Sequence, residues 1–244
     1  IPVARALQTA DRPLPIDPYL YGFWLGNGNA VKPEVTARTC DVPSFLRQVS
    51  CGVSSSWEQH GGGSWIFRIP ALKPALLSGF REKRIPADYL CASARQRWAP
   101  LQGLMDSDGS VSTVKSQSTY VSTVRQLAED VRELLWSLGI KNAMTESPST
   151  RYGKPTGETL YTIRFTAFED QAVSRLNRKS ERKRERRKKT RSCFHYLKDI
   201  YPLEERVRMR CIQVDSPSRC YLAGRSFVPT HNSELAAAVA LYML

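Results

Sequence analysis

Hydrophobic residues recur at helical spacing in two short stretches of the chain, and each stretch stops at a glycine. These stretches are residues 20–28 (LYGFWLGNG) and residues 101–109 (LQGLMDSDG). Each carries two small residues four positions apart, which lie on one face of a helix. These small residues are Gly22 and Gly26 in the first stretch and Gly103 and Ser107 in the second. Because small residues let two helices approach closely, the pattern predicts a packed helix pair.

The two predicted helices end at matching polar residues. Asn27 stands before the closing glycine of the first helix, and Asp108 stands before that of the second. Packing would therefore bring their side chains together. A carboxylate at a helix C-terminus is unfavourable, because the macrodipole is already negative there. Since a bound divalent cation reverses these local electrostatics, Asp108 and Asn27 are candidate metal ligands.

Capping residues predict where the helices begin and end. Asp17-Pro18 supplies an N-cap and a proline at the first helical position. Pro100 is expected to open the second helix. A third helix is predicted over residues 121–138, where apolar residues recur at three and four positions, and Gly139 ends it.

β-prone segments follow both motif helices. Residues 35–38, 65–69 and 161–165 predict strands, and Gly61-Gly62-Gly63 predicts a hairpin loop. Residues 111–120 are polar and β-prone, which predicts a solvent-facing hairpin. Residues 210–215 and 220–223 predict two more strands near the C-terminus.

Charge and cysteine usage change the picture only modestly. The chain has 244 residues, of which 41% are hydrophobic, and a net charge of +13, which suggests a polyanionic partner. Much of this excess lies in residues 175–191, a type of run that is usually solvated; a role as a phosphate-tracking arm stays open. Six cysteines form no CxxC pair and three histidines complete no zinc pattern, which favours free thiols in a reducing compartment. No apolar stretch is long enough for a membrane span, so no membrane partner is expected.

The two stretches ending at Asn27 and Asp108 resemble the paired motif of LAGLIDADG homing endonucleases, of the kind embedded in inteins. The second stretch is a close match, whereas the first has Asn27 where the family usually has Asp. The resemblance implies an α+β fold of two pseudo-symmetric αββαββα-like halves that acts as a monomer on double-stranded DNA. It also implies Mg²⁺-dependent phosphodiester hydrolysis in the intein-less allele of the host gene, with the metal at Asp108 and Asn27.

The same resemblance suggests further site residues. Lys83-Arg84-Ile85-Pro86 resembles the Lys-x-Ile-Pro block that precedes the second motif in intein endonucleases, where the lysine lies near the scissile phosphate. Lys83 is therefore a candidate catalytic residue. Lys115, Arg38 and Arg164 are candidate DNA contacts, because basic side chains position such a protein on phosphates without reading the base sequence.

The C-terminal residues His231-Asn232-Ser233 resemble the end of an intein. Asn232 can attack its own peptide carbonyl with its side-chain amide and cleave the bond as a succinimide, while His231 donates a proton or polarises the carbonyl. Ser233 supplies a hydroxyl that accepts an acyl group from the upstream flank. Cys211 with Thr230 resembles inteins that lack an N-terminal nucleophile and use an internal Cys for the first acyl shift. An ordinary intein whose first Cys or Ser lies outside this sequence is the alternative.

These assignments divide the chain into six expected segments. They are a linker (1–16), two endonuclease halves (17–99 and 100–174), a basic linker (175–194), a β-rich C-terminal piece of the splicing (Hint) domain (195–232) and the start of the host protein (233–244). The last segment would follow a Gly-Lys pair, which resembles the phosphate-binding loop of a phage terminase large subunit. The start at Ile1 and the missing N-terminal splicing half suggest a fragment. Its expected setting is the cytoplasm of a bacterial cell, encoded by a phage or prophage.

Three functions stay open from the sequence. The first is an active site-specific endonuclease joined to a splicing segment. The second is a splicing element whose nuclease has decayed into a non-cleaving, DNA-binding insert. The third is an unrelated basic adaptor, for which both motifs and the His-Asn-Ser end would be coincidences. Because the amide of Asn27 can ligate a metal but brings no charge, we expect weakened metal binding and a weak or inactive nuclease.

Overall fold

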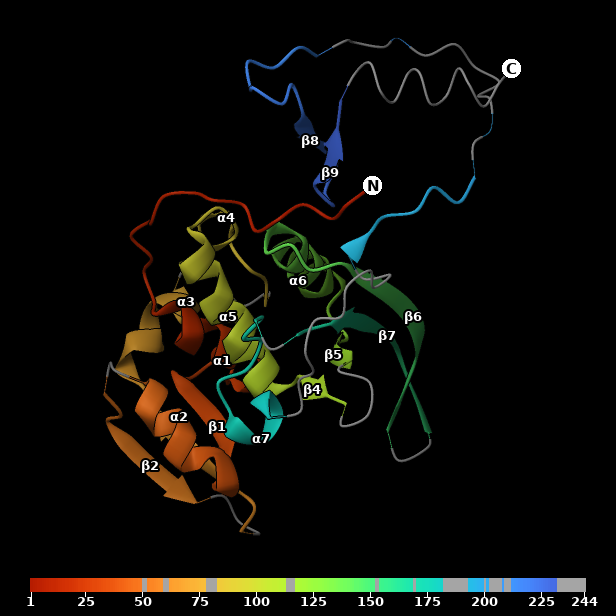
Figure 1. Cartoon of the computed structure of the whole chain (residues 1–244). Coiled ribbons are helices and arrows are strands. Elements are labelled where there is room, and N and C mark those ends of the chain that lie inside the picture. The colour runs from red at the N-terminus through yellow and green to blue at the C-terminus, as the bar shows by residue number, and fades with distance from the viewer. Residues whose placement is uncertain are drawn as a thin grey trace.

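Two halves of helix and sheet lie on either side of a central helix pair, α1 (Pro18–Asn27) and α5 (Ala94–Ser107) (Figure 1). The structure is a computed structural model. It describes residues 1–49, 52–58, 62–77, 83–112, 117–151, 154–168, 170–181, 193–199, 201, 208 and 212–231.

Helix α1 forms the centre of the core. The predicted start is confirmed, because the Asp17 carboxylate accepts a hydrogen bond from the backbone N–H of Leu20 at 2.9 Å and Pro18 follows the cap. Residues 19–25 are all buried, as expected for a helix that is apolar on every side. The Phe23 ring packs 4.6 Å from that of Phe45. This burial holds the far end of α1, where Asn27 lies, in a fixed place.

Helix α5 begins six residues earlier than the sequence predicted. Ser93 is its N-cap, and a capping box with Gln96 satisfies the first N–H groups. Pro100 therefore lies inside the helix rather than at its start, and the prediction for Pro100 was wrong. The capping signal of Ser93 and Gln96 outweighed the preference of proline for a first turn.

The first half (17–93) contains a three-stranded antiparallel sheet. Its order is β1-β3-β2, from β1 (Glu34–Arg38), β2 (Ser55–Glu58) and β3 (Ser64–Arg68). The helices of this half are η1 (Thr39–Asp41), α2 (Val42–Gln48), η2 (Pro70–Leu72), α3 (Lys73–Leu77) and α4 (Ala87–Leu90). The strands predicted at 35–38 and 65–69 are confirmed. Gly62, between β2 and β3, has φ +76, as a hairpin turn requires.

The second half (94–181) contains a four-stranded antiparallel sheet in the order β4-β5-β7-β6. Its elements after α5 are β4 (Ser110–Val111), β5 (Gln117–Ser122), α6 (Arg125–Ser137), β6 (Asn142–Arg151), β7 (Lys154–Thr166) and α7 (Asn177–Ser180). The predicted amphipathic helix exists but starts at Arg125, because Val121 pairs with Thr162 as part of β5. The strand predicted at 161–165 lies inside β7.

The two halves are related in order but differ in detail. The second half follows the expected αββαββα order. In the described part of the first half, the place of β4 is taken by a single bridge between Gly28 and Val35. The α+β class is confirmed, and the halves are pseudo-symmetric with one strand reduced to that bridge.

The first 16 residues lie along α5 and α6 rather than standing free. They contain no helix or strand, as expected of a linker. However, the N–H of Leu7 donates to the carbonyl of Ser137 at 2.9 Å. The buried guanidinium of Arg97 also donates to the Ser137 carbonyl, at 2.7 Å, and to that of Leu7. This segment is therefore packed onto the second half of the molecule.

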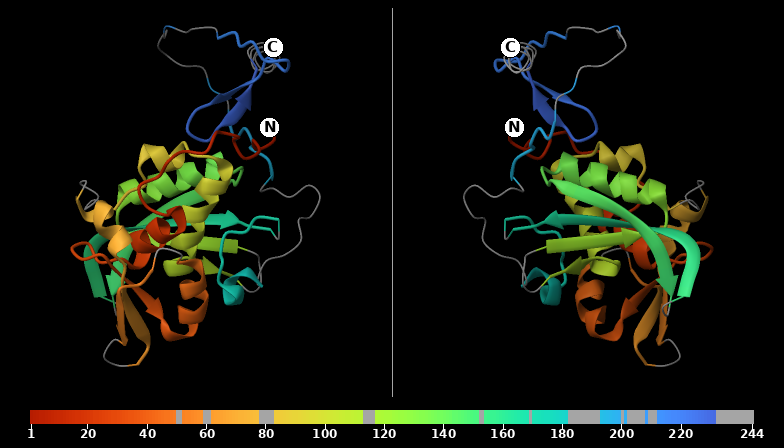
Figure 2. Two further views of the ribbon diagram at one scale, coloured as in Figure 1. Left: turned by 90° about the vertical axis from the view of Figure 1, so that its left-hand side faces the viewer. Right: turned by 90° about the vertical axis from the view of Figure 1, so that its right-hand side faces the viewer.

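A small hairpin stands apart from the two sheets (Figures 1 and 2). It consists of β8 (Tyr221–Ala223) and β9 (Val228–Thr230). In its turn, Arg225 pairs with Glu129 of α6 at 3.6 Å. Since this hairpin is the only sheet among the described residues of 195–232, a Hint-like fold there stays a prediction. No helix in the described ranges is both long and apolar enough to cross a membrane.

Candidate functional site

Glycines bring α1 and α5 into backbone contact. A Cβ on Gly22 would lie 2.1 Å from the carbonyl oxygen of Pro100. A Cβ on Gly103 would lie 2.2 Å from the carbonyl oxygen of Tyr19. Neither position has room for a side chain, so the small-residue faces predicted from the sequence form the contact between the helices.

The C-terminal ends of the two helices meet. A Cβ on Gly26 would lie 2.0 Å from the hydroxyl oxygen of Ser107 and 3.0 Å from Oδ2 of Asp108. Asn27 and Asp108 both line one cavity of about 360 Å³. The structure thus brings together the two residues that the sequence suggested as metal ligands.

The cavity carries charges of both signs. Its walls are formed by Phe23, Asn27, Arg38, Asp41, Asp106, Ser107, Asp108, Gly109, Ser110, Val111, Arg178 and Lys179. Two of its three carboxylates are already engaged. Asp41 accepts two hydrogen bonds from Arg178. Asp106 accepts several from the residues that directly precede Arg178 in the chain. Asp108 is exposed, and among the described residues its side chain has no hydrogen bond or salt bridge. Asp108 is therefore the carboxylate that is open to a ligand.

Lys83 lies at the C-terminus of α1. Its ammonium donates to the carbonyls of Gly26 at 3.1 Å and Gly28 at 3.3 Å. These carbonyls have no N–H partner within the helix, which is the usual state of a helix end. Burial lowers the pKa of Lys83, while the charge of Asp108 opposes that shift. Desolvation of the carboxyl group by the surrounding protein raises the pKa of Asp108, and the positive charges of Lys83 and Lys179 oppose this rise.

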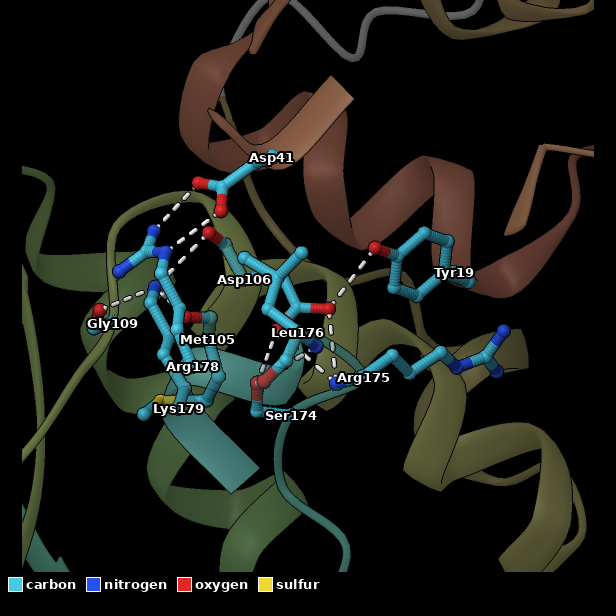
Figure 3. A network of polar contacts seen from close by, with 10 residues as sticks. All are labelled: Tyr19, Asp41, Met105, Asp106, Gly109, Ser174, Arg175, Leu176, Arg178 and Lys179. Carbon is cyan, nitrogen blue, oxygen red and sulfur yellow. Dashed lines mark hydrogen bonds and ion pairs between the residues drawn. The ribbon is translucent and has the colours of Figure 1, made fainter. Parts of the chain in front are cut away.

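Lys179 occupies the corresponding place at the end of α5 (Figure 3). It is 4% exposed, and its ammonium donates to the carbonyls of Met105 (2.6 Å), Gly109 (2.7 Å) and Asp106 (3.0 Å). Burial, and then the charge of Arg178, lower the pKa of Lys179 to about 8. The sequence reading missed this residue.

The prediction of a basic linker from residue 175 was wrong for its first residues. Residues 175–181 are part of the described structure, and they include helix α7. The available signal was apolar: Val173 and Leu176 are 0% and 2% exposed, and they precede the densest charges. A buried lysine among eleven basic residues has no sequence signature of its own, because its partners are backbone carbonyls about 70 positions away.

The candidate DNA contacts lie on different surfaces. Arg38, at the end of β1, lines the cavity. Arg164 is exposed on β7 and donates to the hydroxyl of Thr145 at 2.9 Å, on the sheet face away from the core. Lys115 lies outside the described residues. Their role in DNA binding stays a prediction.

Of the candidate splicing residues, Thr230 and His231 are described, and they lie at the end of the β8–β9 hairpin, away from the two helix ends (Figure 1). Thr230 ends β9, pairs with Tyr221, and donates to the carbonyl of Val228 at 3.1 Å. His231 follows directly. Cys211, Asn232, Ser233 and the rest of the expected host segment lie outside the described residues, so their part in splicing stays a prediction.

The donor set at the helix ends fits a hard divalent cation. Asp108 supplies a carboxylate and Asn27 an amide oxygen, and both are oxygen donors, which Mg²⁺ prefers. No group of three His, Cys, Asp or Glu in the described ranges is arranged to hold a metal. Mg²⁺ is commonly held by one or two carboxylates, with waters and substrate phosphates completing its shell. The site therefore suits a metal that DNA helps to bind.

Comparisons with known proteins agree with this geometry. Residues 96–198 match the family described as LAGLIDADG-like domain. The matched range is less than half of the chain and includes most of α5, Asp108 and Lys179. The family match begins at Gln96. It therefore covers the second half and also the residues that were expected to form a basic linker.

Among curated proteins, the chain is similar to a replicative DNA helicase DnaB of Mycobacterium intracellulare, with 34% identity over 236 residues. The match covers 95% of this chain and 38% of the helicase, so the chain spans well under half of that relative. The terminase expected as host is not supported by this comparison. Among solved structures, mesophilic variants of the homing endonuclease I-DmoI match at 15% identity, over 62% of this chain and 88% of that chain, with a TM-score of 0.43. I-DmoI bound to DNA and Mn matches over 62% and 89%, at 15% identity and the same TM-score.

Proposed function

We propose that the body of this chain is a site-specific DNA endonuclease whose active site is the cavity between the ends of α1 and α5. The observation that carries the proposal is the meeting of Asn27 and Asp108 at two glycine-packed helix ends. The LAGLIDADG-like match over residues 96–198 supports the same function. Its substrate would be double-stranded DNA, and the pseudo-symmetric body would act as a monomer.

The residues of the cavity divide the work. Asp108 and the amide oxygen of Asn27 would hold Mg²⁺, which when bound supplies an activated water and charge stabilisation at a phosphodiester. Arg38 adds a positive charge at the mouth of the cavity, where it would attract a DNA phosphate. Lys83 and Lys179 neutralise the negative ends of the helix dipoles that point into the site.

Asn27 makes the two proposed metal ligands differ in charge. An amide contributes no charge to a metal, so metal affinity and activity should be lower than with two carboxylates. We therefore propose a weak nuclease. The alternative is an insert that binds DNA but no longer cuts it, which the same substitution favours.

A cleavage assay separates these functions. A plasmid carrying the uninterrupted helicase-like host gene around the insertion point would be incubated with Mg²⁺ at low salt, with Asp108→Ala as control. Cutting that vanishes in the control supports an active nuclease. Cutting only after Asn27→Asp supports a decayed enzyme on an intact scaffold. Absence of cutting by both the wild type and Asn27→Asp would overturn the nuclease proposal.

We further propose that residues 195–232 are the C-terminal part of an intein. The hairpin β8–β9 carries Thr230 and His231 directly ahead of Asn232 and Ser233. Cyclisation of Asn232 breaks the bond to Ser233, with the proton supplied to the leaving amine by His231. The Ser233 hydroxyl is the acyl acceptor, and Cys211 is one candidate for the first acyl shift. An N-terminal splicing half would be the required partner.

The host of the insertion is proposed to be a replicative DNA helicase, because a DnaB-type helicase is the curated relative along nearly the whole chain. The setting would be the bacterial cytoplasm. Mass spectrometry of the chain mixed with an N-terminal half tests the splicing proposal. A fragment ending in a succinimide at 232 is expected, and it should be absent from Asn232→Ala. An identical fragment from that variant would contradict the mechanism.

A further inference from the structure

The segment Ser174–Lys179 contacts both halves of the molecule at the seam beside Asp108 (Figure 3). Toward the first half, the guanidinium of Arg175 lies 4.4 Å from the ring of Tyr19 and donates to the side chain of Gln48 at 2.9 Å. Toward the second half, it donates to the side chain of Gln102 at 2.6 Å. One arginine therefore joins three elements that are far apart in the sequence.

Asp106 is the acceptor at the centre of these contacts. It is 3% exposed, and its carboxylate accepts from the hydroxyl of Ser174 (2.5 Å), the N–H of Arg175 (3.1 Å) and the hydroxyl of Tyr19 (3.0 Å). Burial raises the pKa of Asp106, and these hydrogen bonds oppose that rise because they favour the ionised, acceptor-only form. The matching position in α1 is Leu25, an apolar core residue. The acid therefore has a role at one helix end that the other end lacks.

A second acid holds the same segment from the first half. Asp41 accepts from Nε of Arg178 at 2.7 Å and from Nη2 at 2.6 Å. This is the two-bond geometry in which arginine and a carboxylate pair most strongly. The Asp41 side chain is 9% exposed and that of Arg178 is 37% exposed. Both lie in the wall of the cavity that holds Asp108.

We propose that the 174–179 segment fixes the two halves in register at the nuclease site, with Asp41 and Asp106 as positioning residues. Held by these two acids, the segment places Lys179 on three carbonyls around the end of α5. The backbone on both sides of Asp108 is then fixed. The catalytic part of this inference rests on the nuclease function proposed above, whereas its structural part does not.

The expected consequence is a loss of rate rather than a loss of DNA affinity. A reacting group displaced by about 1 Å lowers an enzymatic rate by up to about 100-fold. If Arg178 instead served mainly as a phosphate contact, its removal would weaken DNA binding and make that binding less salt-dependent. The two roles therefore differ in which constant changes.

The test is a charge swap across the seam. Asp41→Arg, Arg178→Asp and the double swap would be compared with Glu34→Gln as a matched control. Glu34 forms a similar half-buried pair with Arg68 at 2.8 Å, in the first sheet. The measurements are hydrogen exchange of residues 174–176, the dissociation constant for target DNA, and the single-turnover cleavage rate at saturating DNA.

We expect each single swap to speed exchange at 174–176 and to lower the cleavage rate by about 10- to 100-fold. The double swap should restore most of the exchange protection and most of the cleavage rate. Glu34→Gln should change neither the exchange nor the cleavage rate. Unchanged exchange in the single variants, or a double swap no better than either single one, would overturn the proposal. A loss confined to DNA affinity would also overturn it. If the wild type cuts no DNA, the exchange data still decide the structural claim, so failure of the nuclease function is distinguishable.

Discussion

The ends of α1 and α5 meet at one cavity, and each has a lysine on its backbone carbonyls, but their charges differ. At the end of α1, Asn27 is neutral and Lys83 reaches two carbonyls. At the end of α5, Asp108 is charged and Lys179 reaches three. The close contact depends on glycines in both helices. The cation site proposed above, in contrast, has a charged residue at only one of the two helix ends. Scaffold and chemistry are therefore separable in this molecule, and the two ends can be tested against each other.

The largest difference is expected between Asp108→Ala and Asn27→Ala. Removing the charged ligand should abolish metal-derived stabilisation of several kcal/mol, which is a rate loss of about 10³-fold. Removing the neutral ligand should lower the rate by about 10-fold or less. Single-turnover cleavage of a target plasmid measures both. Equal losses would mean that the two ends contribute equally.

The shared scaffold should be sensitive at Gly26. A methyl group there would lie 2.0 Å from Oγ and 2.7 Å from Cβ of Ser107, and such overpacking lowers the free energy of unfolding by about 1–3 kcal/mol. Ser107→Gly in the same chain removes both atoms and should restore most of the loss. Gly103→Ala meets the backbone of Tyr19 instead, so it is the matched variant that no neighbouring side-chain change relieves. Urea unfolding measures all three, and failure of Ser107→Gly to help would contradict the contact.

Asn27→Asp should make the two ends alike. Without metal, two neighbouring carboxylates repel and the variant should unfold at a lower temperature than the wild type. With Mg²⁺ or Mn²⁺, its melting temperature should rise by more than that of the wild type, and its cleavage rate by about 10-fold. Asn27→Ser is the control, because it adds no charge. A metal response identical to that of the wild type would count against a shared metal site.

The last prediction is a dependence of stability on pH at the end of α5. The pKa of Lys179 is lowered from 10.5 to about 8, so between these values the folded chain has released a proton that the unfolded chain still holds. The free energy of unfolding should therefore rise with pH across this window, by up to about 1.4 kcal/mol per unit. Lys179→Met should remove that rise, whereas Lys154→Met on the exposed part of β7 should not. Denaturant unfolding at pH 7.5, 8.5 and 9.5 measures the slope, and an unchanged slope in Lys179→Met would refute the assignment.

Local signals predicted the elements that depend on neighbouring residues. Asp17-Pro18 gave the start of α1, and the paired small residues gave the meeting of Asn27 with Asp108. The start of α5 was missed because the prediction rested on Pro100 alone, whereas the capping box of Ser93 and Gln96 begins the helix.

The role of Arg178 and Lys179 could not be predicted, for a different reason. Their partners are Asp41, 137 positions away, and backbone carbonyls about 70 positions away. A buried lysine and a solvated lysine are the same letter in the sequence, and only the fold distinguishes them. The interpretation of the basic run as a linker was therefore wrong at its first positions, and for residues 182–191, which lie outside the described residues, it stays a prediction.

The bridge between Pro2 and Phe194 has a consequence for how such a domain is inherited. Paired antiparallel residues have Cα atoms about 5 Å apart, so the chain enters and leaves the nuclease body at practically one point. For the insertion proposed above, the whole body would be equivalent to a single tight loop of the surrounding protein, and its gain or loss would leave the flanking backbone nearly undisturbed. The ends of the body, rather than its proposed active site, would then determine where it can be accommodated.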